Sequence, residues 1–309
     1  MQTALLVANP ASSGFSRPLH RRVAATLARK LDVTPVWPSS AEHAQELTGK
    51  AVSDNIDMVI AMGGDGILHH VAQPLVGTAT TLGVIPCGTA NVLARQLGVP
   101  VRATGAAKAL AAGPQVIDAP VLEITGNGPL GPIHRFSLFS FGVGVDAEIV
   151  AAAEADPLRK RDLGPVHYAT TAIGVVRRDI SRRVGGLRVG AGDRSGVGIG
   201  VMAQFRDSYT YFGAMPMRLA ATPPNPMNVL IVEELKARRT LGLLRATLGS
   251  GGLDSAKGFT VWTGVEQFEV AADSPSPMQA DGELLGSMSA IVARFRPQAL
   301  RIAIPAREG

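Results

Sequence analysis

The sequence predicts an α/β protein with two parts, a mostly parallel, doubly wound domain followed by a β-rich domain. In about the first 117 residues, short apolar strands alternate with amphipathic helices, a pattern typical of a parallel sheet covered by helices. Beyond residue 118, strand-like segments broken by Gly and Pro predominate. We therefore expect domains at 1–117 and 118–296, with residues 297–309 available to complete the first domain.

The first domain is expected to contain four strands, each followed by a helix. Each strand is a short apolar run bounded by turn residues, at 3–10, 33–38, 56–62 and 81–86. The helices are expected at 18–31, 40–52, 67–76 and 89–98. In the first helix, Leu19, Val23 and Leu27 recur at helical spacing. Ser40 is suited to cap the second helix, and Gly98 ends the fourth.

The second domain is expected to be largely antiparallel. Its strand-like segments are 118–149, 184–232 and 257–304. Two helical stretches interrupt them, at about 164–180 and 234–248. The Ser- and Pro-rich stretch 273–283 is expected to form a loop, followed by a strand at 288–295.

Composition restricts the class of protein. The 309 residues contain one cysteine, Cys87, which excludes an intramolecular disulfide and fits a reducing compartment. The first ten residues lack a basic region and a long apolar region, so we expect no signal peptide. No apolar run reaches the length of a membrane span. These features predict a cytoplasmic protein.

The positive charge is concentrated in one segment. Residues 159–183 contain seven basic and two acidic residues, which gives +5, the same as the net charge of the whole chain. Such a patch can attract phosphates, nucleic acid or anionic lipid. A solvated helix face with local ion pairs explains it equally well.

Three polar loops follow strands of the first domain. They are Asn9–Gly14, Gly63–Gly66 and Pro86–Asn91. In open α/β sheets, ligands bind outside the carboxyl ends of the strands. Glycines let backbone amides face a ligand, and the start of a following helix favours an anion. Each loop alone could be an ordinary turn, but together the three predict a phosphate-binding edge.

Other nucleotide-binding signatures are absent or misplaced. The sequence has no GxxxxGK[ST] loop and no kinase-type GxGxxG loop with its distant lysine. Residues Gly142–Ala147 match GxGxxA, but they lie in the β-rich part without a βαβ unit. Cys87 has His69 and His70 nearby in sequence but no evident third catalytic group, so a small buried residue is the better interpretation.

The motifs "NPASSG", "GGDGILHHV" and "PCGTANVLARQLGVP" resemble the nucleotide-site motifs of the diacylglycerol kinase catalytic family, which includes bacterial lipid kinases and sphingosine kinases. Further segments resemble the family in the same order, namely "FGVGVDAEIV", "KRDLGPVHY", "LGLLRATLGSGGLD" and "MQADGELLG". The resemblance implies a phosphofructokinase- and NAD-kinase-like first domain and a β-sandwich-like second domain. It places the nucleotide in the cleft between them.

The resemblance implies an ATP- and Mg²⁺-dependent kinase that phosphorylates a lipid hydroxyl, such as that of diacylglycerol, in phospholipid biosynthesis. The nucleotide-binding residues would be Asn9, Pro10, Ala11, Ser12, Ser13, Ser39, Gly63, Gly64, Asp65, Gly66, Ile67, Gly88, Thr89 and Asn91. Asp65 would also help to bind the metal ion. The acceptor hydroxyl would lose its proton to Glu283 or Asp281. Two carboxylates flanking one glycine in an extended segment would project to a similar side, although they could instead cap a hairpin turn.

The resemblance also implies partners. Arg159, Lys160 and Arg161 would face an anionic membrane, giving peripheral attachment, whereas no nucleic acid partner is expected. A homodimer is left open. Two alternatives remain, a kinase of a soluble hydroxyl compound and a nucleotide-binding regulatory protein without catalysis. The second is suggested by Ile67 and His70, which stand where many bacterial relatives have Thr and Glu, and by Asn225, which stands where they often have a metal-binding Asp.

Overall fold

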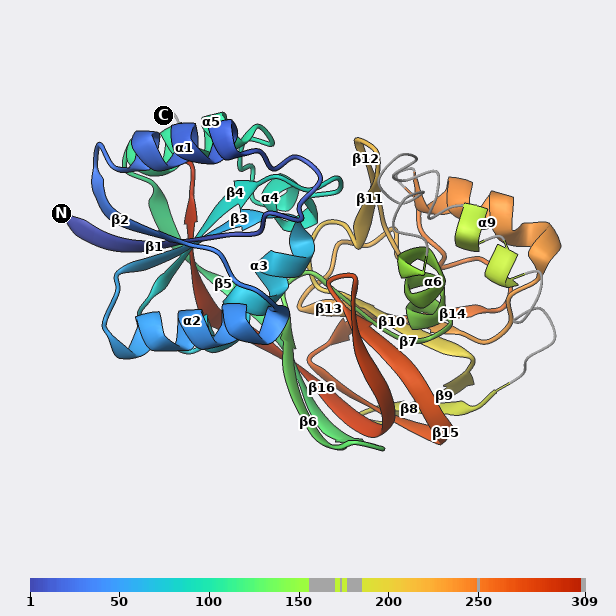
Figure 1. The fold of residues 1–309 in the computed structure, drawn as a ribbon. Coiled ribbons are helices and arrows are strands. Elements are labelled where there is room, and N and C mark those ends of the chain that lie inside the picture. The colour runs from blue at the N-terminus through green and yellow to red at the C-terminus, as the bar shows by residue number, and fades with distance from the viewer. Residues whose placement is uncertain (156–169, 173, 177–184, 249–250, 307–309) are drawn as a thin grey trace. The chain divides into compact units, whose positions relative to one another are not determined.

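A computed structural model of the chain describes residues 1–155, 170–172, 174–176, 185–248 and 251–306 (Figure 1). The chain forms two compact units. Unit 1 comprises Met1–Val121 and Pro297–Gly309, and unit 2 comprises Leu122–Arg296. No helix among the described residues is long and apolar enough to cross a bilayer.

Unit 1 is built on a parallel sheet with the strand order β4–β3–β1–β2. Its strands are β1 (Gln2–Ala8), β2 (Leu31–Val36), β3 (Met58–Gly63) and β4 (Thr81–Pro86). Every residue of β3 and β4 is buried, as expected for central strands covered on both faces. The last part of β16 (Glu283–Ile304) pairs with β4, with Ile302 opposite Leu82. The parallel α/β sheet expected from the sequence is thus confirmed.

The helices of unit 1 cover both faces of this sheet. They are α1 (Arg17–Leu27), α2 (Ala41–Ser53), α3 (Asp65–Ala72), α4 (Val92–Gln96) and α5 (Ala103–Ala111), with a 3-10 turn at Gln73–Leu75. Helix α1 packs against α5, and α2 packs against α3, on opposite faces of the sheet (Figure 1). Ser16 caps α1 by accepting a hydrogen bond from the Leu19 amide, and Ser40 caps α2 in the same way from His43.

Unit 2 is mainly an antiparallel sheet in the order β14–β13–β10–β7–β15–β16. Its elements are β5 (Gln115–Gly128, begun in unit 1), β6 (Gly131–Ser137), β7 (Ser140–Gly144), α6 (Val145–Glu154), β8 (Leu187–Ala191), β9 (Arg194–Gly198), β10 (Gly200–Gln204), β11 (Thr210–Phe212), β12 (Met215–Met217), β13 (Met227–Val232), a 3-10 turn at Ala237–Arg239, α9 (Thr240–Thr247), β14 (Phe259–Val265), β15 (Gln267–Ala280) and β16.

Strand β15 joins two parts of this sheet. Its first half pairs with β8 and its second half with β7, with register shifts between. The sheet therefore curls over one core, in which Phe141, Val201, Val229 and Phe268 are buried. The strong antiparallel character expected for this part of the chain is confirmed.

The structure differs from the sequence-based expectations at several places. Residues 273–283 do not form a loop, because β15 continues to Ala280, and its Ser-Pro residues lie where the pairing register shifts. Residues 145–149 are helical in α6 and not a strand, since Ala- and Glu-rich sequence follows the positive φ of Gly144. Helix α5 was not expected. Most of the predicted helix at 164–180, together with Arg159–Arg161, lies outside the described residues.

Candidate functional site

The three loops expected to form a phosphate-binding edge are joined by backbone hydrogen bonds. The Asn9 amide donates to the carbonyl of Met62 at 3.0 Å, and the Gly14 amide donates to that of Cys87 at 2.8 Å. The Cys87 amide in turn donates to the Gly63 carbonyl at 2.7 Å. Parallel strands bring their carboxyl ends to one edge, and these bonds fix the three loops against each other there.

Two glycines allow the second and third loops to touch. A Cβ on Gly88 would lie 2.5 Å from the Cα of Gly64, and a Cβ on Gly64 would lie 3.3 Å from the Cα of Gly88. Neither position can take a side chain without moving the other backbone. A Cβ on Gly63 would collide with the side chain of Ile67. The glycines therefore serve the close packing of backbone at this edge.

Helix α3 begins directly after these glycines. Gly64 is its N-cap and has no side chain to cap the first amide groups of the helix. Asp65 is the first helical residue, and its Oδ2 accepts a hydrogen bond from the Val92 amide at 3.1 Å. The same carboxylate thus joins the starts of α3 and α4. A helix start of this kind favours anions.

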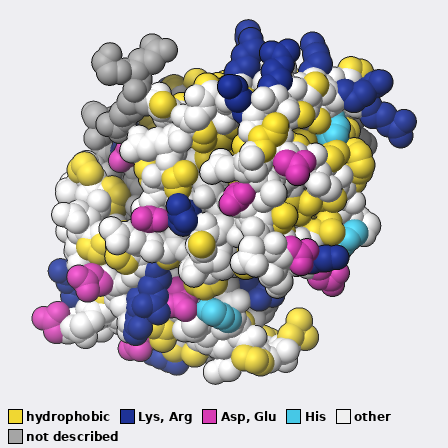
Figure 2. All heavy atoms as spheres, turned by 90° about the vertical axis from the view of Figure 1, so that its left-hand side faces the viewer, with side chains coloured by type: hydrophobic (Ala, Val, Ile, Leu, Met, Phe, Trp, Pro, Cys, Tyr) yellow, Lys and Arg dark blue, Asp and Glu magenta, His cyan; other side chains and the backbone are white. Residues whose placement is uncertain are grey.

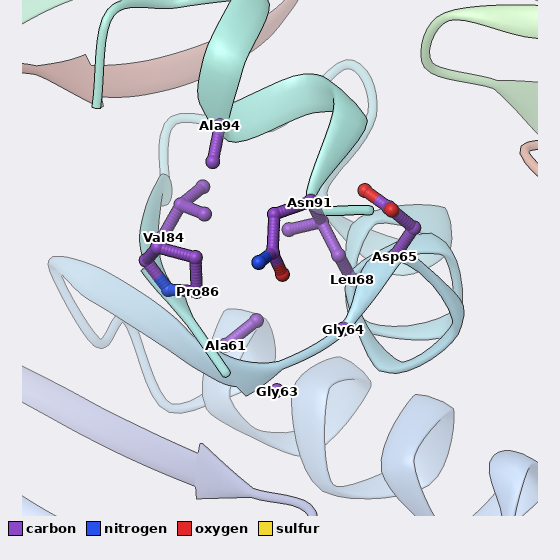
Figure 3. Close-up of a pocket in the computed structure, with 9 residues that line it drawn as sticks. All are labelled: Ala61, Gly63, Gly64, Asp65, Leu68, Val84, Pro86, Asn91 and Ala94. Carbon is purple, nitrogen blue, oxygen red and sulfur yellow. The ribbon is translucent and has the colours of Figure 1, made fainter. Parts of the chain in front are cut away.

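Asn91 shapes the third loop from within. Its Oδ1 accepts from the Gly88 amide at 2.9 Å, and its Nδ2 donates to the Gly88 carbonyl at 2.7 Å. The residue is buried and has a left-handed backbone conformation with φ of 48°. Figure 3 shows its amide in the middle of the surrounding side chains, with Asp65 at the edge. The side chain of Asn91 therefore holds the loop in shape.

The interior of this loop cluster is closely packed. The pocket lined by the residues labelled in Figure 3 has a volume of about 10 Å³, which is room for about one water molecule. A larger cavity of about 300 Å³ lies on the α1–α5 side of the loops. Its walls are Ser13, Gly14, Leu19, Pro86, Cys87, Gly88, Val101 and Ala103. The interior of the loop cluster therefore has no room for a ligand as large as a nucleotide.

Other predicted nucleotide-site residues are also placed by hydrogen bonds. The hydroxyls of Ser13 and Thr89 lie 3.3 Å apart, so the first and third loops also meet through side chains. The Ser39 hydroxyl lies 2.9 Å from Nδ1 of His43, which also accepts from the Ser39 amide. Ser12, Pro10 and Ala11 lie in the turn after β1, where the Ala11 amide donates to Oδ1 of Asn9.

The two departures from the family motif have structural explanations. Ile67 is buried and packs at Gly63, so its side chain fills the loop interior. His70 lies on α3, and its Nδ1 is 3.1 Å from the side-chain nitrogen of Gln45 on α2.

Cys87 is buried as well, and burial raises the pKa of its thiol to about 11. Cys87 is therefore a thiol and not a reactive thiolate at neutral pH.

In unit 2, the predicted Asp281 and Glu283 lie at a tight β-hairpin. Ala280 pairs with Glu283, and the two residues between them have positive φ, 57° for Asp281 and 84° for Gly282. An Asp-Gly pair with two positive φ values is typical of a type I′ turn. The expectation that both carboxylates project from one extended segment is therefore wrong, because Asp281 sits in the turn itself.

The carboxylate of Asp281 is surrounded by donors. Its Oδ1 accepts from the Ser137 hydroxyl and the Phe139 amide, each at 2.9 Å, and from the Ser140 amide at 3.2 Å. The Leu138 amide donates to both oxygens at 2.9 Å. Only 3% of the residue is exposed. Glu283, by contrast, is partly exposed at the start of β16.

A second buried carboxylate lies behind this turn, and sequence reasoning missed its role. Oδ2 of Asp146 accepts from the Tyr209 hydroxyl and from Nε2 of Gln279, both at 2.6 Å. Oε1 of Gln279 accepts from the Gly282 amide at 2.9 Å. Desolvation by burial raises the pKa of Asp146, although the hydrogen bonds from Tyr209 and Gln279 oppose that effect. The sequence signal that could have revealed this role is the position of Asp146, an acidic residue inside the apolar stretch "FGVGVDAEIV".

The glycines of "GVGVDA" serve packing around that carboxylate. A Cβ on Gly142 would collide with Asp146, and one on Gly144 would collide with the Ile199 carbonyl. Strand β7, which contains both glycines, pairs antiparallel with β10 and β15. A dinucleotide fingerprint requires a parallel βαβ unit, so that alternative is excluded.

Comparison with known proteins agrees with the motif resemblance. Residues 3–121 match the family described as diacylglycerol kinase catalytic domain. A diacylglycerol kinase of Mycobacterium tuberculosis H37Rv is 38% identical over 83 residues, a match that spans 27% of each chain. A probable lipid kinase, YegS-like, of Xanthomonas euvesicatoria is 28% identical over 267 residues, covering 82% of this chain and 80% of the relative.

Solved structures show the same fold. A putative diacylglycerol kinase from Bacillus anthracis Sterne superposes with a TM-score of 0.74 at 17% identity, covering 98% of this chain and 97% of the other. The resemblance first seen in the motifs is therefore confirmed: residues 3–121 match the diacylglycerol kinase catalytic domain, and the whole chain has the fold of these solved structures.

Proposed function

We propose that this protein is an ATP-dependent lipid kinase that transfers the γ-phosphoryl group of ATP to a lipid hydroxyl such as that of diacylglycerol. The observation that carries the proposal is the close approach of Gly64 and Gly88 beside the start of α3. Phosphoryl transfer depends mainly on positioning and on neutralising charge, and backbone amides at a helix start supply both.

The residues of unit 1 would hold the nucleotide. The amides that begin α3 and those of the Gly88–Thr89 loop would donate to phosphate oxygens. The hydroxyls of Ser13 and Thr89 lie beside each other at this edge and would contribute further donors. Because these groups are fixed by the loop hydrogen bonds, little reorganisation is required when phosphate binds.

Asp65 fits a magnesium ion that takes most of its ligands from the nucleotide and water. No group of three or more His, Cys, Asp or Glu side chains within the described parts of the chain could hold a metal. Mg²⁺ in phosphoryl-transfer sites is commonly held by one or two carboxylates plus phosphates and waters, so one carboxylate at a phosphate-binding edge suffices. When bound there, the ion would supply charge neutralisation on the phosphates.

Glu283 is proposed as the group that accepts the proton of the acceptor hydroxyl. It is partly exposed, whereas the carboxylate of Asp281 is committed to the donors of residues 137–140. Asp281 could accept a proton only by weakening those hydrogen bonds. We therefore assign Asp281 to holding the turn from which Glu283 projects. Asp65 belongs to unit 1 and Glu283 to unit 2.

The proposal is tested with γ-labelled ATP, Mg²⁺ and a panel of lipids in mixed micelles. Labelled lipid is expected, and Asp65→Ala should abolish it. Absence of labelled product with every lipid, together with nucleotide binding measured by calorimetry, would contradict the kinase proposal and favour a regulatory nucleotide-binding protein. Labelling of a soluble hydroxyl compound but of no lipid would favour the soluble-substrate kinase.

A further inference from the structure

The two helices on one face of unit 1 carry only positive charge. Residues 17–31 and 101–113, which include α1 and α5, contain no Asp or Glu. They contain seven exposed cations, here called the cationic face: Arg17, Arg21, Arg22, Arg29, Lys30, Arg102 and Lys108. None of the seven forms an ion pair with a carboxylate in the part of the chain that the structure describes. Figure 2 shows Lys and Arg side chains gathered along its upper edge, the level of α1 and α5 in Figure 1.

The charges on α1 oppose the stability of the helix itself. Arg17 is the first helical residue, where a cation faces the positive end of the helix dipole. Arg17 and Arg21 are four residues apart, so their like charges repel on the same side of the helix. Helix α2 on the opposite face shows the usual arrangement, with Glu42 in its first turn and Lys50 in its last. The charge of α1 is thus better suited to an external anion than to internal stabilisation.

Exposed apolar side chains border the same face. Trp37 is 50% exposed, and its ring lies 5.1 Å from that of His20 on α1. Val101, which is 48% exposed, directly precedes the N-cap of α5, and Val116, which is 40% exposed, follows that helix. We call these three residues the apolar rim. Trp beside a basic surface is typical of proteins that lie at the lipid–water interface.

We propose that the cationic face and the apolar rim dock unit 1 on an anionic lipid bilayer. Cations would approach the headgroups while Trp37, Val101 and Val116 enter the interfacial layer. A nucleic acid would satisfy the cations, but the aliphatic side chains of Val101 and Val116 favour lipid. The inference rests on the proposed function in one respect: a kinase whose acceptor is a lipid must reach that lipid in a membrane. The docking itself is tested without ATP.

The test is co-sedimentation of the full chain with vesicles of phosphatidylcholine, with and without phosphatidylglycerol. Binding is expected only with phosphatidylglycerol and should weaken as salt rises. Each cation near such a surface contributes roughly fivefold to partitioning, so Arg17→Gln/Arg21→Gln/Arg22→Gln should lower it about 100-fold. The matched control Lys50→Gln/Lys257→Gln/Arg301→Gln removes the same charge elsewhere and should change it much less. Equal losses in the two triple variants, or no loss in the first, would overturn the proposal.

Tryptophan emission gives an independent readout. The chain has two tryptophans, and Trp262 is buried. In a Trp262→Phe variant, the emission of Trp37 should shift to the blue on anionic vesicles and not on a short DNA duplex. An unshifted emission with bound vesicles, or equal affinity for DNA and vesicles, would reject the docking surface. Kinase activity in detergent micelles is measured separately, so a failure of docking is distinguishable from a failure of the proposed reaction.

Discussion

Asp65 in unit 1 and Asp281 in unit 2 are both followed by glycine, yet the structure gives them opposite surroundings. Asp65 begins a helix at a loop edge, and one backbone amide, that of Val92, donates to it. Asp281 occupies a left-handed position in a hairpin turn, with three backbone amides and one hydroxyl around its carboxylate. The same dipeptide therefore begins a helix in one unit and forms a hairpin turn in the other.

The comparison shows that the backbone decides the role of an Asp-Gly pair. At Asp65 the following residues continue as helix, so the carboxylate stays beside the amides that would bind phosphate. At Asp281 both residues of the pair have positive φ, which turns the chain and aims the carboxylate back at residues 137–140. For this reason the proton acceptor that we propose in unit 2 is Glu283, the first residue after the turn.

The largest effect is expected when each carboxylate of the hairpin is neutralised separately, which tests whether Glu283 or Asp281 is the proton acceptor. Glu283→Gln should lower kcat by about 10²- to 10⁴-fold, the usual contribution of a positioned general base. Asp281→Asn keeps an oxygen for the amide donors and tolerates a positive φ, so its kcat should stay within about tenfold of the parent. Steady-state kinetics with saturating ATP and a lipid acceptor measure both values.

The KM for ATP serves as the internal control in this pair, because neither residue belongs to the nucleotide loops. It should remain unchanged in both variants. A larger loss of kcat in Asp281→Asn than in Glu283→Gln would reverse the assignment and make Asp281 the base.

The second test removes the whole carboxylate of the turn. Asp281→Ala leaves buried amide donors without an acceptor and forces Ala into a left-handed conformation. Because a buried unsatisfied donor costs roughly 1–3 kcal/mol, the free energy of unfolding should fall by about 3–5 kcal/mol. Asp65→Ala, which removes the acceptor of the Val92 amide at a partly exposed edge, should cost about 1 kcal/mol. Urea unfolding followed by circular dichroism measures both, and similar losses would refute the structural contrast.

The sequence predicted the loops at the edge of the unit 1 sheet far better than the hairpin of unit 2. Strand–helix alternation and the glycine loops are local patterns, and parallel pairing brings the loop residues to one edge without further information. The donors of Asp281 are about 140 positions away, and those of Asp146 come from two other strands or loops. Such long-range hydrogen bonds leave no periodic signal. Ile67 and Asn91 were placed in the correct loops, but their inward side chains could be seen only in the structure.

A third test concerns the loops beside Asp65 and asks whether the contact between Gly64 and Gly88 controls nucleotide binding. Gly88→Ala places a Cβ 2.5 Å from the Cα of Gly64, so the two loops must separate. Overpacking of this kind costs about 1–3 kcal/mol, and the loop shift should raise the KM for ATP about tenfold or more, with a smaller effect on the lipid KM. Gly98→Ala is a useful control for strain alone, because that glycine has a positive φ but open space around it.

Equal increases in the KM for ATP in these two glycine variants would show that general destabilisation, and not the contact of Gly64 with Gly88, controls nucleotide binding. Calorimetric titration with ATP, performed well below the unfolding temperature of each variant, separates the two explanations.

The smallest expected effect concerns the buried acid behind the hairpin. Burial raises the pKa of Asp146 in the folded protein, so the folded state holds its proton more tightly than the unfolded state does. The stabilisation linked to this proton is complete below the ordinary carboxyl pKa of about 3.9 and is lost as pH rises through the higher folded value. Asp146→Asn removes that dependence. Its stability relative to the parent should therefore improve as pH rises from about 4 to 7. Unfolding in urea across this range tests the sign, and a relative stability that falls with rising pH would show that the hydrogen bonds from Tyr209 and Gln279 outweigh burial. In that case Asp146, like Asp281, would be a carboxylate stabilised by its donors.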